Sequence, residues 1–108
     1  MKRQQQFLDY LKFERGLSPR TLNAYHRDLQ RFAAELNEAG VSDPARVTEH
    51  HVRRFIARLH RQGLGPRSIQ RGLSAIRSYY RWLMKEGLAE NNPAAAVLSL
   101  IHISEPTR

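Results

Sequence analysis

Two short segments of the chain place a proline, an arginine and a hydroxyl residue in the same order. They read GLSPRTL over residues 16–22 and GLGPRSI over residues 63–69. Proline suits the first turn of a helix, because its φ angle is already helical and the N–H that it lacks would have no partner there. Ser18 or Gly65, directly before the proline, is an acceptable helix cap. Both segments therefore predict the start of a helix.

The arginine after each proline, Arg20 or Arg67, indicates what these helix starts could bind. A cation beside the positive end of a helix dipole is unfavourable unless an anion is bound there. Free backbone N–H groups, one Arg side chain and the hydroxyl of Thr21 or Ser68 together suit a phosphate. One copy alone would be explained by tolerance of these residues at an exposed helix start. The repeat favours an anion-binding function.

The overall charge also indicates a polyanionic partner. The 108 residues include 18 Lys and Arg against 10 Asp and Glu, which gives a net charge of +8, the pattern expected of a nucleic-acid-binding protein. A membrane partner is disfavoured, since the basic residues are spread over several segments and no apolar stretch is long enough to span a bilayer. The N-terminus lacks the apolar core of a signal peptide. We therefore expect a cytoplasmic protein that binds double-stranded DNA and no membrane.

Apolar residues recur at helical spacing, and no segment alternates for long enough to predict a strand, so the expected fold class is all-α. The length suggests one domain, and a chain without Cys must rely on a hydrophobic core. We expect four helices over residues 2–15, 19–39, 49–62 and 66–86, with Thr48 as the cap of the third and a glycine after each. The inward residues are expected to be Phe7, Leu8, Tyr10, Leu11, Leu22, Tyr25, Leu29, Phe32, Leu36, Val52, Phe55, Ile56, Leu59, Ile69, Leu73, Ile76, Tyr80 and Leu83, with Phe13, Tyr79 and Trp82 at the edges of the core.

Basic side chains follow the opposite faces of the second and fourth helices at steps of three and four. These faces carry Arg20, Asn23, Ala24, Arg27 and Arg31 on the second helix, and Arg67, Arg71, Ser74, Ser78, Arg81 and Lys85 on the fourth. Long Arg side chains separated by small residues allow a helix to approach a duplex closely. The acids of the second helix, Asp28, Glu35 and Glu38, are expected to the side of this face or late in the helix. An ordinary solvated face is the alternative, although few acids interrupt the fourth helix.

Other functional chemistry is not indicated. The basic residues of the third helix, Arg53, Arg54, Arg58 and Arg61, are expected to be solvated or to contact backbone at most. The four tyrosines lie on or beside apolar stripes, which favours packing over nucleophilic catalysis. The five histidines show no metal-ligand spacing, and no Cys supports them. We therefore expect no metal, no cofactor and no catalytic residues in this chain.

An ordered set of motifs resembles the N-terminal domain of Xer-type tyrosine site-specific recombinases. The motifs are Phe7–Leu11, Glu14–Leu22 followed by Tyr25, Asp28, Leu29 and Phe32, then Ser68-Ile69, Leu73–Leu83, Glu86-Gly87 and Asn92–Ala94. The resemblance covers residues 7–97 and is closest to the XerC branch. The XerD branch and the integrases of mobile elements stay open, as does a helical protein-interaction domain with basic faces that serve only solubility.

The resemblance implies a SAM-like core-binding domain, an orthogonal four-helix bundle that forms half of a clamp around a recombination site. The second and fourth helices of such a domain face the major groove, and sister recombinase subunits assemble on the same DNA to resolve chromosome dimers before cell division. The implied DNA-binding residues are Arg20, Thr21, Asn23, Arg27, Arg67, Ser68, Arg71 and Ser74. For this to hold, the Arg-lined faces of the two helices must lie on one outward surface.

The family also implies a division of the chain. Residues 1–93 are expected to form the core-binding domain and residues 94–97 the start of an interdomain linker. Residues 98–108 are foreign to the family and resemble translated sequencing-adapter sequence, with a natural short variant as the alternative. In relatives, Arg, Lys and His residues of a further, catalytic domain activate the scissile phosphate and a Tyr attacks it. We expect that domain to be absent here, and the chain to be a monomer without enzymatic activity.

Overall fold

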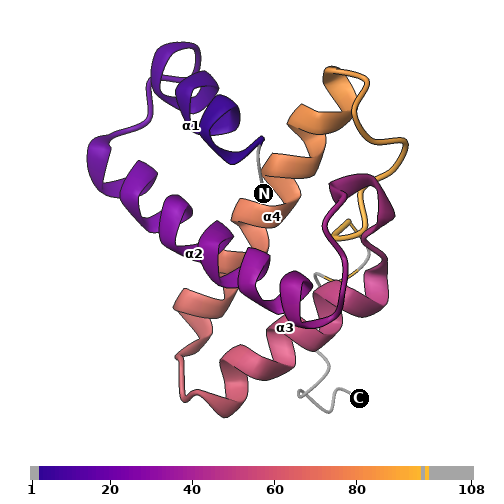
Figure 1. Cartoon of the computed structure of the whole chain (residues 1–108). Coiled ribbons are helices and arrows are strands. Elements are labelled where there is room, and N and C mark those ends of the chain that lie inside the picture. Colours follow the sequence, from indigo (N-terminus) through magenta and orange to yellow (C-terminus); the bar gives the residue numbers. More distant parts are fainter. Residues whose placement is uncertain (1–2, 96, 98–108) are drawn as a thin grey trace, which may run out of the picture.

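A computed structural model describes residues 3–95 and 97 of the chain, and these residues form an all-helical fold (Figure 1). The helices are α1 (Gln4–Phe13), α2 (Pro19–Glu38), α3 (Glu49–Arg61) and α4 (Pro66–Lys85), with a short 3-10 helix, η1 (Pro44–Arg46), between α2 and α3. No strand occurs in this part of the chain. The all-α prediction with four long helices is confirmed, and each helix ends within two residues of its predicted bounds.

Local side-chain chemistry explains why the helices begin where they do. Ser18 Oγ accepts a hydrogen bond from the backbone N–H of Thr21 at 3.3 Å, which caps the first turn of α2. At the start of α3, the backbone N–H of Thr48 donates to Nδ1 of His51 at 2.9 Å, so a histidine occupies the position of the usual acidic partner in a capping box. Gly16 and Gly63, which precede the two repeated prolines, adopt left-handed φ angles of 63° and 83° and allow the chain to turn sharply out of α1 and α3.

The helix η1 lies between the second and third helices predicted from the sequence, in a segment for which no helix was expected. Asp43 Oδ1 accepts a hydrogen bond from the N–H of Ala45 at 3.0 Å, and Pro44 supplies the φ angle of a tight turn. Tyr80 on α4 then donates its hydroxyl to the carbonyl of Pro44 at 2.6 Å. This segment is therefore fixed to α4 by a contact that only the folded molecule makes.

The core lies where α2 packs against α1, α3 and α4, and α2 and α4 cross each other in Figure 1. The apolar residues predicted to point inward are buried, except that Leu8, Tyr10, Leu22 and Tyr25 are only partly buried against the core. The prediction for Phe13 was wrong, since 74% of it is exposed. Phe13 follows the inward Leu11 by two residues, so it lies about 200° further around the helix.

Tyr79 and Trp82 lie deeper than the edge position predicted for them. Their rings pack against Phe7 of α1, with centroid distances of 5.3 Å for Tyr79 and 5.9 Å for Trp82. Such aromatic pairs add to the free energy gained by burial alone. They attach the short helix α1 to the C-terminal half of α4.

The chain stays in contact with the bundle after α4 ends. Asn92 donates its side-chain amide to the carbonyl of Arg77 at 3.2 Å and accepts from the N–H of Ala94 at 3.0 Å. Ala94 and Val97 are fully buried. The division at residue 93 stays a prediction, and the predicted tail over residues 98–108 lies outside the described residues. In the part of the chain that the structure describes, no helix has the length and apolar character needed to cross a membrane.

Candidate nucleic-acid interface

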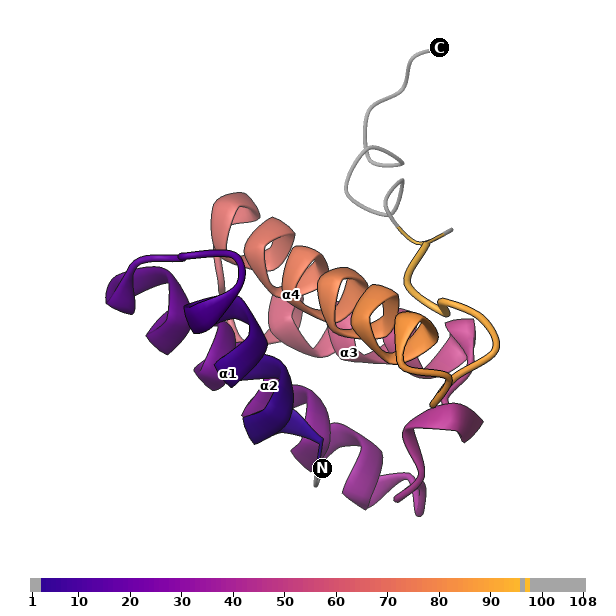
Figure 2. The same ribbon diagram turned by 90° about the horizontal axis from the view of Figure 1, so that it is seen from above.

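The two repeated segments start helices that lie on the same side of the molecule. In both Figure 1 and Figure 2, the beginnings of α2 and α4 lie toward the left, whereas η1 lies toward the right. Each helix runs from this side toward the point where the two cross. The N-terminal halves of α2 and α4 are thus available together on one side of the bundle.

None of the eight residues predicted to contact DNA lies in the core. Arg20, Asn23, Arg27 and Arg67 are exposed, and Thr21, Ser68, Arg71 and Ser74 are half-buried. The exposed four therefore place three cations and one amide in solvent, the groups that bind phosphates and base edges. The hydroxyl of Thr21 is already engaged, because Ser18 donates to it over 3.1 Å.

Arg71 has a partner that the sequence did not predict. Its Nε and Nη2 atoms donate to the two carboxylate oxygens of Asp28 over 2.8 and 3.1 Å. The Asp28 side chain is 2% exposed and that of Arg71 is 36% exposed. The hydrogen bond to Asp28 raises the pKa of Arg71 above its ordinary value, so the guanidinium stays charged.

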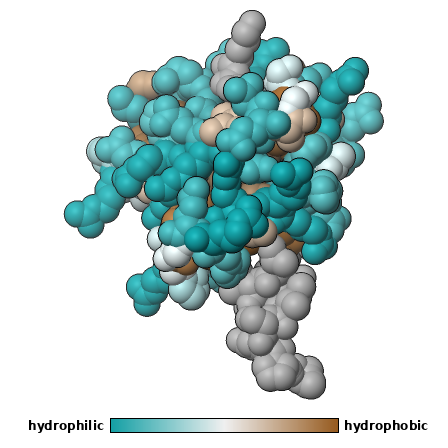
Figure 3. All heavy atoms as spheres, turned by 60° about the horizontal axis from the view of Figure 1, so that its bottom comes forward, coloured by the Kyte–Doolittle hydropathy of each residue, from teal (hydrophilic) through white to brown (hydrophobic). Residues whose placement is uncertain are grey.

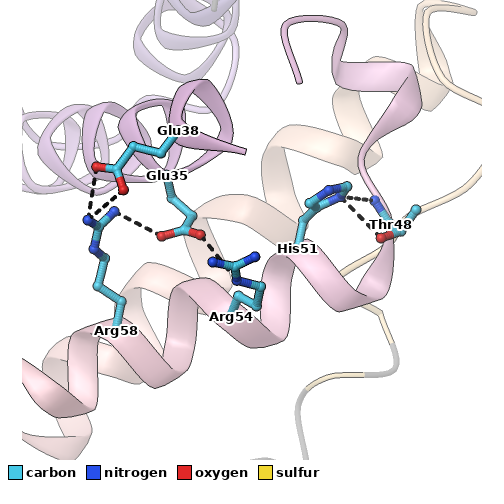
Figure 4. A network of polar contacts seen from close by, with 6 residues as sticks. All are labelled: Glu35, Glu38, Thr48, His51, Arg54 and Arg58. Atoms are coloured by element: carbon cyan, nitrogen blue, oxygen red, sulfur yellow. Dashed lines mark hydrogen bonds and ion pairs between the residues drawn. The ribbon is translucent and has the colours of Figure 1, made fainter. Parts of the chain in front are cut away.

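Asp28 and Glu35, which were expected to the side of the basic face or late in the helix, are buried and paired with arginines of other helices. Glu35 Oε1 accepts from Nη1 of Arg58 on α3 at 2.9 Å, and Glu38 accepts from Nη2 of the same guanidinium at 2.9 Å (Figure 4). Arg54 adds an ion pair to Glu35 at 3.7 Å. The hydrogen bond to Glu38 raises the pKa of Arg58.

These contacts also correct the expectation for the basic residues of α3. Arg54 and Arg58 join α3 to α2, and Arg53 pairs with Glu49 on its own helix. A signal for this pairing was present in the sequence. Asp28 and Glu35 lie four before and three after the inward Phe32, so helical geometry places them beside the apolar stripe, where an acid needs a partner.

The basic face predicted along α4 is divided in two. Its N-terminal part, with Arg67, Arg71 and Ser74, lies before or at the crossing with α2. Its C-terminal part, with Ser78, Arg81 and Lys85, lines a hollow of about 280 Å³ against α1 together with Phe7, Tyr10, Leu11, Arg15 and Trp82. Lys85 lies over the ring of Tyr10 at 5.3 Å. Only the N-terminal part of the face is shared with α2.

The surface around the start of α4 is polar. Figure 3, which brings the lower side of Figure 1 forward, shows mostly hydrophilic side chains with small, separate apolar areas. A polar face with an excess of cations is typical of protein–DNA interfaces. Among the described residues, no three His, Cys, Asp or Glu side chains come together as they would around a metal ion.

The chain is similar in sequence to known recombinases. The chain is 45% identical to "Tyrosine recombinase XerC" of Xanthomonas campestris pv. campestris (strain B100) over 91 residues, which cover 84% of this chain and 28% of the relative. It is 45% identical to the XerC of Xanthomonas axonopodis pv. citri (strain 306), covering 85% of the chain and 33% of the relative, and 43% identical to that of Azotobacter vinelandii, covering 84% and 30%.

The chain thus spans about a third of the length of the curated relatives it matches. No solved structure shows significant similarity to it. The sequence profile described as "Phage integrase, N-terminal SAM-like domain" matches residues 5–87, a range that contains all four helices except the first residue of α1. The chain therefore belongs to the family of phage integrase N-terminal SAM-like domains.

Proposed function

We propose that this chain is the DNA-binding, core-binding region of a XerC-like tyrosine recombinase and that it contacts duplex DNA through the N-terminal halves of α2 and α4. The observation that carries the proposal is the position of the two repeated helix starts on one side of the bundle, together with the exposure of Arg20 and Arg27 in the first half of α2 and of Arg67 in the first turn of α4. Two separate helices can then contact one duplex at the same time.

The three exposed arginines have a definite role in this proposal. Each can neutralise a phosphate or donate to a guanine edge in the major groove. Asn23 lies between Arg20 and Arg27 on the same face and can pair with an adenine edge. The small side chains at Ala24 and Ser74 leave room for the duplex.

We assign the breakage and rejoining of DNA to the full-length recombinase and not to this region. This chain matches the relatives over about a third of their length, and we assign that third to binding. In the full-length protein, the region would hold one side of the recombination site while sister subunits occupy the other half-site. The product would be resolved chromosome dimers.

The test is a fluorescence-anisotropy titration of the whole chain against two duplexes. One duplex carries a XerC-type recombination half-site, and the other is the same sequence scrambled. We expect tighter binding to the half-site. We also expect the affinity for both to fall between about 50 and 200 mM salt, with a log–log slope near −0.9 for each neutralised phosphate. Absence of duplex binding at both salt concentrations would contradict the proposal and favour a helical protein-interaction domain.

A further inference from the structure

We infer that Asp28 is a positioning residue, which holds the guanidinium of Arg71 in the orientation that reads the recombination site. The inference deepens the proposed function and rests on it. Asp28 comes from the middle of α2 and Arg71 from the second turn of α4, so the contact lies where the two DNA-facing helices cross.

The contact leaves one side of the guanidinium free. Arginine has five N–H donors in a planar arrangement, and Asp28 takes one on Nε and one on Nη2. Two donors on Nη1 and one on Nη2 remain. These lie on the edge away from the carboxylate, and a bidentate contact to a guanine needs only two parallel donors.

The carboxylate itself is held in place. A Cβ atom built at Gly72 would lie 3.9 Å from Cγ of Asp28 and 3.5 Å from Cδ1 of Leu59, so Asp28 packs directly over the backbone of α4 beside Arg71. Arg31 adds a second cation at 3.8 Å from Asp28 Oδ1. Because Asp28 is 2% exposed whereas Arg71 is 36% exposed, a duplex can contact Arg71 but not Asp28.

Fixing a flexible side chain before binding improves specificity. A free Arg must lose its rotamer freedom when it binds, and it can adopt whichever rotamer suits an incorrect base pair. An Arg held on one edge by a buried carboxylate loses less entropy on binding and offers one geometry. Asp28 would therefore contribute to discrimination between sequences rather than to affinity for DNA as such.

A purely structural contact between α2 and α4 predicts something different. Loss of such a contact would lower the stability of the bundle and weaken binding to every sequence alike. The ratio of affinities for the half-site and the scrambled duplex is therefore the deciding readout. Removal of a negative charge from the protein raises both affinities together, so this ratio is insensitive to that change.

The experiment measures this ratio for the unchanged chain and for Arg71→Ala, Asp28→Asn and the double variant. Arg71→Ala is expected to lower the ratio by about 5- to 150-fold, the equivalent of one lost base-edge pair. Asp28→Asn keeps the size of the side chain but presents an NH₂ group to one of the two donors of Arg71. We expect it to lower the ratio at least threefold and to leave the salt slope unchanged, since Arg71 keeps its charge. The double variant should match Arg71→Ala.

Glu35→Gln is the matched control. It neutralises another buried acid on α2, one that pairs with α3 and makes no contact with Arg71. Its ratio should stay within twofold of the unchanged chain. Asp28→Ser serves as a second variant in case Asp28→Asn does not fold, because it removes both carboxylate oxygens that hold Arg71 and adds no bulk over α4. It should lower the ratio as Asp28→Asn does, with an unchanged salt slope.

Two outcomes would overturn the inference, and they are distinguishable. A ratio that falls in Arg71→Ala but persists in whichever of Asp28→Asn and Asp28→Ser folds shows that Arg71 acts without being held, and the proposed function survives. Equal affinity of the unchanged chain for both duplexes removes sequence reading by this chain, and the role of Asp28 with it.

Discussion

Tyr79 and Tyr80 are neighbours in the core but differ in their hydrogen bonds. Both are buried, and Tyr80 donates to the carbonyl of Pro44 at 2.6 Å, whereas the hydroxyl of Tyr79 has no partner among the described residues. A buried polar group without a partner is destabilising. We expect Tyr79→Phe to increase the free energy of unfolding by about 1 kcal/mol and Tyr80→Phe to decrease it by about 1 kcal/mol, as measured by urea denaturation. A decrease of equal size in both variants would contradict the difference in hydrogen bonding.

The buried hydroxyl of Tyr79 also makes the free energy of unfolding depend on pH in the alkaline range. Burial raises the pKa of Tyr79 to about 12, above the value near 10 of an exposed tyrosine. The unfolded chain therefore releases this proton at lower pH than the folded chain, so stability is complete below pH 10 and falls as the pH rises toward 12. The fall should be shallower in Tyr79→Phe. Some of it should remain, because burial raises the pKa of Tyr80 as well.

The burial of a side chain could be predicted from the local sequence, whereas its hydrogen-bond partner could not. The spacing of apolar residues was sufficient to place Tyr79 and Tyr80 in or near the core, because helical periodicity alone determines the side of the helix. It could not indicate which hydroxyl finds an acceptor, since the carbonyl of Pro44 lies 36 positions away in the chain. The position of Asp28 beside the apolar stripe could be read from its spacing, but its partner Arg71 could not, since it lies on another helix 43 positions away.

Two glycines of the α4 region have opposite backbone requirements. Gly72 is buried inside α4, and a Cβ atom there would make ordinary van der Waals contacts, the shortest at 3.5 Å. Gly87 follows the helix with a φ angle of 74°, which favours glycine. We expect Gly72→Ala to stabilise the fold by about 0.5 to 1 kcal/mol and Gly87→Ala to destabilise it by about 1 kcal/mol. Thermal unfolding followed by circular dichroism checks both, and a loss of stability in Gly72→Ala would show that α2 and α4 pack too closely for a methyl group.

Helix bounds were predictable because they are set within a few residues. Ser18, Pro19 and Gly16 each act on their own turn of the chain, so their effect can be read from the sequence. The helix η1 and the pairing of Arg58 with Glu35 depend instead on contacts between elements. The position of α2 relative to α4, on which the proposed interface depends, was expected only because the chain resembles a known family.

The whole molecule divides its charges unequally between inside and outside. The buried acids Asp28 and Glu35 are turned inward and paired with arginines of α4 and α3. The exposed face of the first half of α2 is therefore left with cations, although the helix as a whole contains acids. Three of the exposed cations behind the net charge of +8, Arg20, Arg27 and Arg67, lie in the first halves of α2 and α4, and cations on one side of a protein attract a polyanion to that side.

This distribution predicts a salt effect that depends on position. The double variant Arg20→Ala and Arg67→Ala removes two exposed cations from the side where both helices begin, and each lost phosphate contact should reduce the log–log salt slope of duplex binding by about 0.9. Arg46 on η1 is an exposed cation on the opposite side of the bundle, and Lys85 is exposed at the C-terminal end of α4, so the double variant Arg46→Ala and Lys85→Ala, which removes the same two charges, is the matched control. That control should keep nearly the full slope in anisotropy titrations from about 50 to 200 mM salt. An equal reduction in both double variants would mean that the duplex responds only to total charge, and that α2 and α4 do not bind it through a common face.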